Sequence, residues 1–297
     1  MRIKESTGDR IFGAVVNTIL ALCVLACAYP LYLVLINSFS DPDLVSQGKV
    51  WWRPIGFTLD AYMEVFKNKD ILQGYGNALY YTVLGTALNM VLTIPAAYAL
   101  AKPQLYGRNA IMKLLVFTMY FSGGLVPHYI LMQGLGLLNT RMGVLVVGAV
   151  ATTNLIIART FFASSIPREL EEAAEIDGCS ELQTFWKIVL PLSKAIMAVI
   201  TLYYMVGHWN SYFTEMMYLR DREKYPIQLI LRSILSMSRV DPKDMQGVDG
   251  EQLSQMIGAA DVLKYGLIVI STVPILCVYP FIQKYFEKGV MVGSVKG

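Results

Sequence analysis

Long apolar blocks alternate with polar segments along this chain. Six blocks are long enough to cross a bilayer as helices, which takes about 20 residues each. They cover about residues 11–36, 76–101, 111–133, 143–163, 191–214 and 262–284. Because a helix satisfies its backbone hydrogen bonds within one segment, blocks of this length favour helices over strands in a bilayer. The pattern predicts an all-α integral membrane protein, with six transmembrane helices in a single transmembrane domain over residues 1–297.

The first block is predicted to be a retained span and not a cleaved leader. Basic residues precede it, and Ala26-Cys27-Ala28 resembles a cleavage site. However, the apolar run continues to about Ile36, and five further blocks follow it. A run of that length spans a membrane, so we interpret it as the first transmembrane helix.

The short flanking segments predict the orientation in the membrane. Lys and Arg gather in short cytoplasmic segments. They are found here in the N-terminal tail and in the connection after the second block, at Arg2, Lys4, Arg10, Lys102, Arg108 and Lys113. Both termini are therefore predicted to be cytoplasmic. That places residues 164–190 inside and the longer segments 37–75 and 215–261 outside.

Composition and charge exclude several classes of protein. The chain is 55% hydrophobic and only 16% charged, whereas soluble domains usually carry about a quarter of charged residues. Its net charge of +3 comes without a run of Lys or Arg, so nucleic acid is not expected as a partner. The lipid bilayer is an expected partner.

Enzyme chemistry finds little support in the sequence. Cys23, Cys27 and Cys277 lie in apolar blocks, Cys179 stands alone in a polar segment, and no pair has metal-ligand spacing. The phosphate-cradling motif Gly-x-x-x-x-Gly-Lys-[Ser/Thr] is absent, so the chain is not expected to bind a nucleotide itself. We expect no catalytic residue, no metal and no cofactor in this chain.

Residues 165–191, between the fourth and fifth blocks, form the most informative polar segment, which we call the coupling segment. Ser165 and Pro167 favour a helix start, and Glu169, Glu171 and Glu172 suit its first turns through the helix dipole. Gly178 favours a helix end, because glycine readily adopts positive φ. A second amphipathic stretch follows, with Leu182, Phe185 and Trp186. We predict a short helix, a turn and a second helix parallel to the membrane.

The coupling segment resembles the EAA loop of ABC importer permeases in residue order, in spacing and in its place between the fourth and fifth of six spans. The matching residues are Glu172, Ala173, Ala174, Asp177, Gly178, Ile188, Leu190 and Pro191. The likeness is strongest to the MalG-like and LplC-like carbohydrate permeases. It extends to Asn77-Ala78-Leu79, residues 96–101, Trp209-Asn210 and the tail from Lys288 to Gly297.

The resemblance implies a permease subunit of a binding-protein-dependent sugar importer in the cytoplasmic (inner) membrane of a prokaryotic cell. In such importers two permeases form a heterodimer around the path, and each lays its EAA helix in a groove of one ATPase subunit. ATP and Mg are bound by the two ATPase subunits. An extracytoplasmic binding protein delivers the sugar. Relatives of this group carry oligosaccharides, including uronate-containing ones. Within the motif, Ile188 and Leu190 are interpreted as packing residues.

A polar and aromatic patch in the fifth block is a candidate part of the substrate path. It comprises Tyr203, Tyr204, His208, Trp209, Asn210 and Tyr212. Polar residues in membrane helices usually face protein or a wet cavity, and sugars bind aromatic faces with hydrogen-bonding neighbours. The alternative is an interfacial aromatic belt. Asn89 and Asn154 are interpreted as interhelical contacts.

Two other functions compete with an importer permease. An ion-coupled secondary carrier usually shows intramembrane acids and paired repeats, and neither is evident here. A membrane enzyme is disfavoured by the missing catalytic set. Dependence of transport on a separate ATPase chain distinguishes the importer from both.

Overall fold

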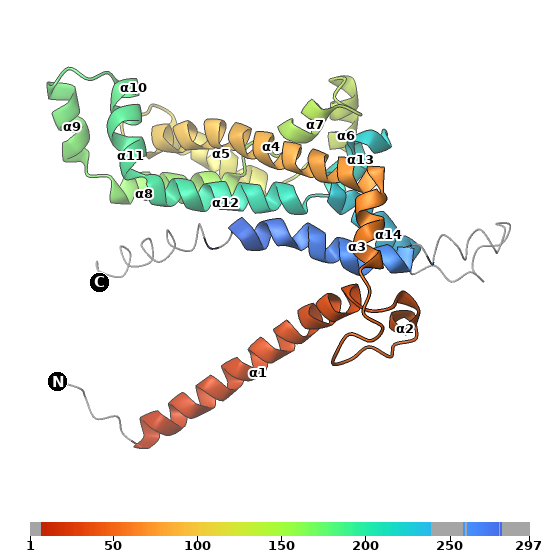
Figure 1. The fold of residues 1–297 in the computed structure, drawn as a ribbon. Helices are drawn as coiled ribbons and strands as arrows, with labels where there is room; N and C mark the ends of the chain where they lie inside the picture. The colour runs from red at the N-terminus through yellow and green to blue at the C-terminus, as the bar shows by residue number, and fades with distance from the viewer. Residues whose placement is uncertain (1–6, 239–257, 259, 279, 281–297) are drawn as a thin grey trace. The chain divides into compact units, whose positions relative to one another are not determined.

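The computed structural model describes residues 7–238, 258, 260–278 and 280, and all of its regular elements there are helical (Figure 1). The first four helices are α1 (Thr7–Ser38), α2 (Pro42–Ser46), α3 (Asp60–Lys67) and α4 (Lys69–Ala101). The next four are α5 (Arg108–Tyr120), α6 (Leu125–Gly134), α7 (Arg141–Val146) and α8 (Thr152–Ser165). Then follow α9 (Arg168–Ile176), α10 (Glu181–Thr184), the π-helix η1 (Phe185–Val189), α11 (Leu190–Leu192) and α12 (Lys194–Asn210). The last are α13 (Phe213–Tyr218), the 3₁₀ turn η2 (Arg222–Lys224), α14 (Ile227–Met237) and a helix over Ala260–Val278.

The chain divides into two compact units. One comprises residues 1–68 and 233–272, and the other comprises residues 69–232 and 273–297. In the first unit, the Ser38 hydroxyl hydrogen-bonds the Tyr62 hydroxyl at 2.8 Å, which ties the end of α1 to α3. Gly266 also lies against Ala61 of α3, where a Cβ atom would approach to 3.1 Å. This unit therefore brings α3 against the helix Ala260–Val278.

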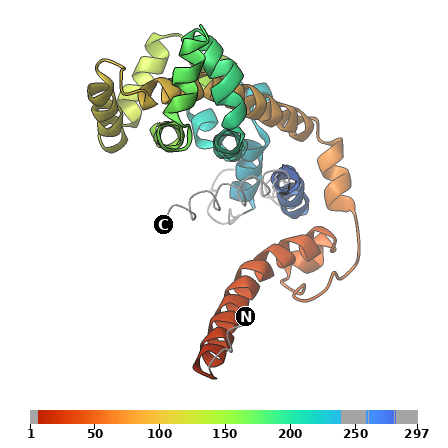
Figure 2. The ribbon, with the colours of Figure 1, turned by 90° about the vertical axis from the view of Figure 1, so that its left-hand side faces the viewer.

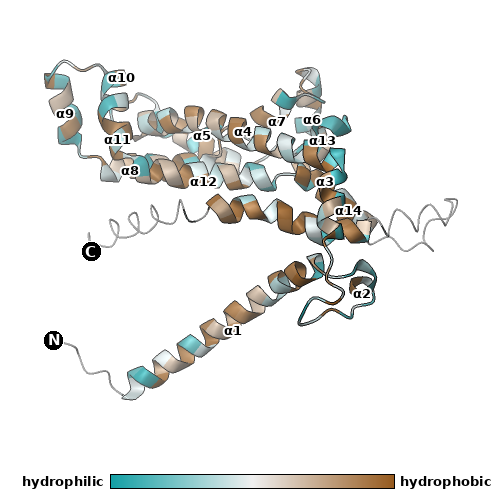
Figure 3. Ribbon diagram, viewed as in Figure 1, coloured by the Kyte–Doolittle hydropathy of each residue, from teal (hydrophilic) through white to brown (hydrophobic). Residues whose placement is uncertain are grey.

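Among the described residues, three helices are long and apolar enough to cross a membrane by themselves: α1, α4 and Ala260–Val278. Brown, apolar stretches recur along α1 and α4 and alternate there with paler ones (Figure 3). Two further spans are bent pairs of helices. The pair α5 and α6 turns by 115°, and residues 181–192 turn by 83° into α12. Gly124, with φ at 84°, lies at the first bend, where a residue with a side chain would be strained.

The fourth predicted span, residues 143–163, is not a continuous helix. It consists of α7 and α8, separated by residues 147–151. Gly148 adopts a φ of 73° in this break, a conformation that a continuing helix does not allow. A periodicity pattern cannot show such a break, because every residue around it remains apolar or small.

The core of the second unit lies where α4, α8 and α12 pack together (Figures 1 and 2). Ile94, Ala97 and Tyr98 of α4 meet Leu155, Ala158 and Phe162 of α8 there, together with Ile196, Ile200 and Tyr204 of α12. Phe185 and Val189 of the coupling segment join the same cluster. The coupling segment is thus rooted in the helix core by apolar contacts.

Candidate functional site

The coupling segment forms a helical hairpin, with α9 and the arm from α10 to α11 side by side (Figure 1). Helix α9 ends at Ile176, and the turn that follows contains Gly178, whose φ is 77°. The Gly178 amide donates to the Glu175 carbonyl at 3.0 Å, and the Cys179 amide donates to the Ala174 carbonyl at 2.9 Å. These two bonds make a Schellman motif, which closes a helix end. The conformation predicted for Gly178 is confirmed.

The predicted start of α9 needs a correction of two to three residues. The helix begins at Arg168, directly after Pro167, and Ser165 is the last residue of α8. Ser165 therefore lies outside α9, and the expectation that it favours the start of this helix is wrong. Proline fixes a backbone angle that suits the residue before a first helical turn, and it defines the start without a side-chain cap.

The EAA residues separate into exposed and buried positions. Glu172, Ala173 and Asp177 are exposed, whereas Ala174 is only 3% exposed. Within the described part of the chain, no hydrogen bond or ion pair occupies the Glu172 carboxylate. The exposed carboxylates and Ala173 are consequently free to meet another surface.

The second arm of the hairpin begins with a capped helix, α10, and continues as a π-helical turn, η1. Ser180 and Gln183 form a capping box at the start of α10, with bonds of 2.9 and 3.3 Å. Leu190 packs against the core, as expected, Ile188 is half-buried, and Pro191 lies in the first turn of α11. The π-helical turn η1 accommodates the change from the hairpin to α12.

Lys102, directly after the end of α4, contacts both arms of the hairpin. Its ammonium lies 2.8 Å from a carboxylate oxygen of Glu171 on α9 and 3.1 Å from one of Glu181 on α10. Burial by itself lowers the pKa of Lys102, but the contacts with Glu171, Tyr98 and Glu181 outweigh it and raise the pKa above its usual value. The lysine therefore stays charged. A cleft of about 680 Å³ opens beside it, lined by Pro95, Leu105, Glu175, Leu182 and Phe185 among others.

The six residues of the polar patch in the fifth block do not share one environment. Tyr203, Asn210 and Tyr212 are exposed. Tyr204 and Trp209 are buried, and His208 is half-buried. The Tyr204 hydroxyl hydrogen-bonds the Thr93 hydroxyl at 2.7 Å, and the Trp209 ring meets Tyr75 edge to face at 5.6 Å. The buried members thus hold α12 against α4.

Asn89 is buried at the junction of α4, α12 and the break between α7 and α8. Its Nδ2 donates to the carbonyls of Ala149 at 2.7 Å and Gly148 at 3.3 Å. Its Oδ1 lies 2.6 Å from His208 Nε2. An amide oxygen only accepts hydrogen bonds, so His208 Nε2 carries the hydrogen and donates it. The expected interhelical role of Asn89 is confirmed. Broken helices in membranes need such side chains, because the freed carbonyls have no water.

Tyr204 of α12 binds the other end of the break between α7 and α8. Its hydroxyl accepts a hydrogen bond from the Ala151 amide at 3.0 Å. Helices α4 and α12 come close here because Gly85 lacks a side chain: a Cβ atom there would lie 2.6 Å from the His208 ring. The break is held by α4 and α12 together.

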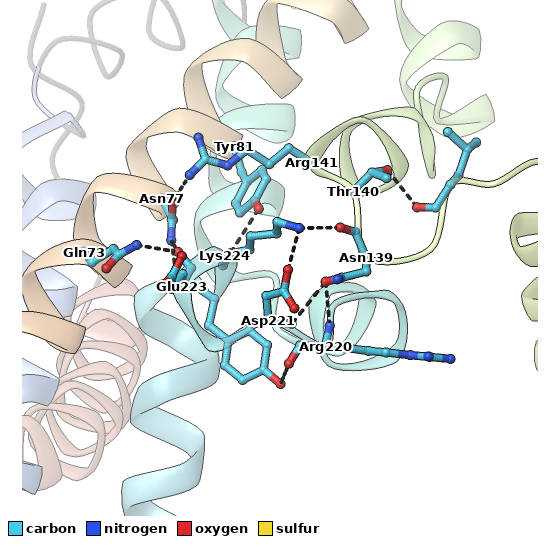
Figure 4. A network of polar contacts seen from close by, with 12 residues as sticks. Gln73, Asn77, Tyr81, Asn139, Thr140, Arg141, Arg220, Asp221, Glu223 and Lys224 are labelled. Carbon is cyan, nitrogen blue, oxygen red and sulfur yellow. Dashed lines mark hydrogen bonds and ion pairs between the residues drawn. The ribbon is translucent and has the colours of Figure 1, made fainter.

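A polar network gathers around Gln73, Asn77 and Tyr81 of α4 (Figure 4). These residues lie near the start of the helix at Lys69, whereas Lys102 follows its other end. We call this polar network the Asn139 network, and it comprises Gln73, Asn77, Tyr81, Asn139, Arg141, Arg220, Asp221, Glu223, Lys224 and Tyr225. The Asn139 side chain accepts from the amides of Arg220 and Asp221, each at 3.1 Å, and its carbonyl accepts from Lys224 Nζ at 2.7 Å.

Helix α4 holds the same loop from its other side. Asn77 donates to the Glu223 carbonyl at 2.7 Å and accepts from Arg141 at 3.0 Å. The Tyr81 hydroxyl donates to the Lys224 carbonyl at 3.0 Å. Hydrogen bonds from the Lys224 and Asn139 side chains lower the pKa of Asp221, which stays ionised at neutral pH. The loop 219–225 is fixed, while the side chains of Arg220, Asp221, Arg222 and Glu223 remain exposed.

The comparison with protein families decides the class of this chain. Residues 2–292 match the family described as "Binding-protein-dependent transport system inner membrane component". This chain belongs to that family. It is a carbohydrate ABC transporter permease, and the members of this class are transport subunits.

Two curated relatives of the permease are from Bacillus subtilis (strain 168). Protein LplC is 41% identical over 268 residues, which is 90% of this chain and 89% of LplC. The polygalacturonan/rhamnogalacturonan transport system permease protein YtcP is also 41% identical, over 97% of this chain and 99% of YtcP. A solved structure, of a bacterial ABC transporter involved in the import of the acidic polysaccharide alginate, is 35% identical. Its TM-score is 0.86, with 96% of this chain and 99% of that chain covered.

Several residues that organise the permease were not identified as site residues from its sequence. Lys102 entered only as a charge that indicates orientation in the membrane, Glu171 entered only as an acidic residue, and Glu181 and Asn139 did not enter at all. Asn139 adopts a φ of 57°, which asparagine tolerates better than most residues. A lone Asn at a turn is the only hint that the sequence offers for it. The tail motif from Lys288 to Gly297 lies outside the described residues.

Proposed function

We propose that this permease forms half of a translocation path for an oligosaccharide, which an extracytoplasmic binding protein delivers. A second, different permease forms the other half, and two separate ATPase subunits drive the cycle. The observation that carries the proposal is the coupling segment, a hairpin that packs into the core through its second arm while Glu172, Ala173 and Asp177 are exposed. Glu172, Ala173, Ala174, Asp177 and Gly178 form or shape the docking surface, and Ile188, Leu190 and Pro191 anchor it.

The substrate class is an acidic oligosaccharide. YtcP and the alginate importer, both at least 35% identical to this chain, are named for acidic polysaccharides. A binding protein and a glycan-cleaving enzyme encoded beside this permease would identify the sugar further. ATP and Mg belong to the ATPase partners.

The experiment that tests this function is reconstitution in proteoliposomes. The permease, with a second permease, the ATPase and a loaded binding protein, is expected to import oligogalacturonides only when ATP is present. Uptake without the ATPase would overturn the proposal in favour of an ion-coupled carrier. A transport-competent complex without any second permease would overturn the heterodimer.

We place the coupling segment and both termini in the cytoplasm of a prokaryotic cell, with the Asn139 network outside. The distribution of Lys and Arg in the short flanks supports this orientation. The two features also lie at opposite ends of α4, which is long enough to span a bilayer. The same arrangement puts the exposed charges of loop 219–225 on the side where a binding protein arrives.

Tyr203 and Asn210 are proposed to line the substrate path, because they lie seven residues apart on one exposed face of the apolar helix α12. A polar face on a membrane helix usually meets protein or water and not lipid. Tyr212 lies just beyond, beside the Arg232 guanidinium at 5.0 Å. Tyr204, His208 and Trp209 support the path from behind by holding α12 on α4.

Tyr203→Ala and Asn210→Ala are expected to raise the KM for uptake roughly two- to ten-fold, because each removes a substrate hydrogen bond of about 0.5–1.5 kcal/mol. Leu192→Ala, at an exposed apolar position of the same bent span, is the matched control and should leave KM unchanged. An unchanged KM in both path variants would remove α12 from the path.

The segment 215–261 is proposed to contact the binding protein. Residues 239–257 and 259 lie outside the described residues, so the proposal is supported by loop 219–225, whose backbone is fixed while its charged side chains are exposed. Deletion of Asp241 to Gly250 is expected to weaken stimulation of ATP hydrolysis by loaded binding protein while basal hydrolysis persists. Stimulation that survives the deletion, or labelling of Asp244→Cys only from the cytoplasm, would contradict it.

A further inference from the structure

We propose that Lys102 is a positioning residue that latches both arms of the coupling segment to the end of α4, so that a displacement of the hairpin is transmitted to α4 as one body. The inference rests on the proposed function, because it assigns the route by which docking at the hairpin reaches the helices. We call the contacts of Lys102 with Glu171 and Glu181 the Lys102 latch.

One ammonium group closes the latch on two separate elements. Glu171 lies on α9 and Glu181 on α10, on either side of the Gly178 turn. Lys102 reaches them at 2.8 and 3.1 Å from a third element, the end of α4. A lysine has three donors and can serve several carboxylates at once. A single side chain therefore fixes the opening of the hairpin and its position against α4.

The surroundings of Lys102 distinguish the latch from an ordinary surface ion pair. The side chains of Lys102 and Glu171 are 19% and 20% exposed, so water and salt screen their attraction less than between exposed groups. The Glu181 side chain is 79% exposed, so the contact with α9 is the better shielded half of the latch. The ammonium also lies 4.8 Å from the centre of the Tyr98 ring. Tyr98 in turn contacts Phe185 of the second arm at 5.1 Å and Phe162 of α8 at 5.8 Å.

The local sequence places the lysine where its charge is favoured. Helix α4 ends at Ala101, because the residue before a proline avoids helical geometry and Pro103 follows Lys102. A cation just beyond the last turn faces the negative end of the helix dipole. On the neighbouring helix, Arg159 donates to the Leu100 carbonyl at 3.0 Å, which holds the same end of α4 to α8. The hairpin, α4 and α8 are thus joined within a few residues.

The competing explanation is a pair of incidental ion pairs, since exposed salt bridges typically contribute about 0–1 kcal/mol to stability. The two explanations differ in what they predict for coupling. Loss of an incidental ion pair would change neither the rate of transport nor the number of sugar molecules imported per ATP. A latch keeps the number of sugar molecules imported per ATP high, and its loss lets the hairpin follow the ATPase without moving α4.

The test measures uptake and ATP hydrolysis together in proteoliposomes of the complete importer, with loaded binding protein. Lys102→Met is expected to lower the sugar imported per ATP roughly two- to thirty-fold, the range found when residues that carry coupling are changed. ATPase subunits should remain bound to the complex. Lys102→Arg, which keeps the charge, is expected to retain most of the coupling.

Lys113→Met is the matched control. It removes the same charge from the same predicted side of the membrane, at an exposed residue of α5. A wild-type ratio in Lys102→Met would overturn the latch, and so would an equal loss in Lys113→Met. Failure of the wild-type complex to bind an ATPase would instead overturn the proposed function, so the two failures are distinguishable.

A covalent link keeps the latch testable if Lys102→Met assembles poorly. Cys23, Cys27, Cys179 and Cys277 are free and would first be replaced by serine. In that background, Lys102→Cys combined with Glu181→Cys is expected to lose coupling and to regain it when a flexible thiol cross-linker joins the two residues. Cross-linking that leaves the ratio low would contradict the latch.

Discussion

Gly178→Pro is expected to uncouple ATP hydrolysis from transport while the permease still inserts into the membrane. Proline holds φ near −65° and has no amide hydrogen, whereas Gly178 needs a φ of 77° and donates to the Glu175 carbonyl. Backbone strain of this kind costs about 1–3 kcal/mol, so α9 will end differently. We expect transport per ATP to fall roughly 5- to 150-fold, the range of a lost coupling free energy.

The control for Gly178→Pro is Gly48→Pro. Gly48 also has a positive φ, of 66°, and its amide also donates to the carbonyl three residues earlier, at 2.9 Å. The same backbone change is thereby made far along the chain from the coupling segment. Normal transport per ATP in Gly178→Pro, or an equal loss in Gly48→Pro, would refute the role of this turn.

Glu172→Lys tests the docking surface without altering the backbone. Glu172 is exposed on α9, so reversing its charge should leave the fold intact and weaken contact with the ATPase. Glu169→Lys makes the same reversal one turn earlier, outside the EAA residues, and is expected to have the smaller effect. Equal ATPase retention on the purified complex in both variants would argue against a specific role for Glu172.

Asn89→Leu is expected to lower the free energy of unfolding by about 2–6 kcal/mol, because two or more buried polar groups lose their partner at about 1–3 kcal/mol each. The groups are the carbonyls of Gly148 and Ala149 and the Nε2–H of His208. Asn89 is fully buried, so water cannot replace these bonds. Thermal unfolding of the purified permease in detergent measures the loss.

Thr86→Val on the same helix is the matched control. The Thr86 hydroxyl is buried and has no hydrogen-bond partner within the described residues, so its replacement by an isosteric methyl group should leave the melting temperature unchanged or raise it. Equal melting temperatures for Asn89→Leu and the parent would show that the break between α7 and α8 does not depend on Asn89.

The path of α7 and α8 illustrates a limit of sequence-based prediction. Hydropathy identified residues 143–163 as apolar, but it did not show the break at 147–151. The break exists because Asn89 from α4 and Tyr204 from α12 satisfy the carbonyls and the amide that a continuous helix would have bonded internally. Those partners lie about 60 and 50 residues away in sequence, beyond the reach of any local pattern.

The polar patch of the fifth block is a second case in which sequence identified a segment and packing decided the role of its residues. Its polar and aromatic residues indicated a part of the substrate path. Only the packing against α4 showed that Tyr203 and Asn210 are exposed, whereas Tyr204 and Trp209 are buried. Tyr203 and Tyr204 are the same residue type at consecutive positions, so local propensity cannot tell them apart. Which of them faces outward depends on where the neighbouring helix lies.

The sequence by itself determined that this is a helical membrane protein with an EAA loop, because apolar length, charge in short flanks and motif spacing are local properties. It also determined the turn at Gly178, because few residues other than glycine adopt that backbone conformation. Only the tertiary structure decided the Lys102 latch, the Asn89 junction and the Asn139 network. Each joins side chains from helices distant in sequence, and such contacts follow from packing, which no stretch of sequence encodes alone.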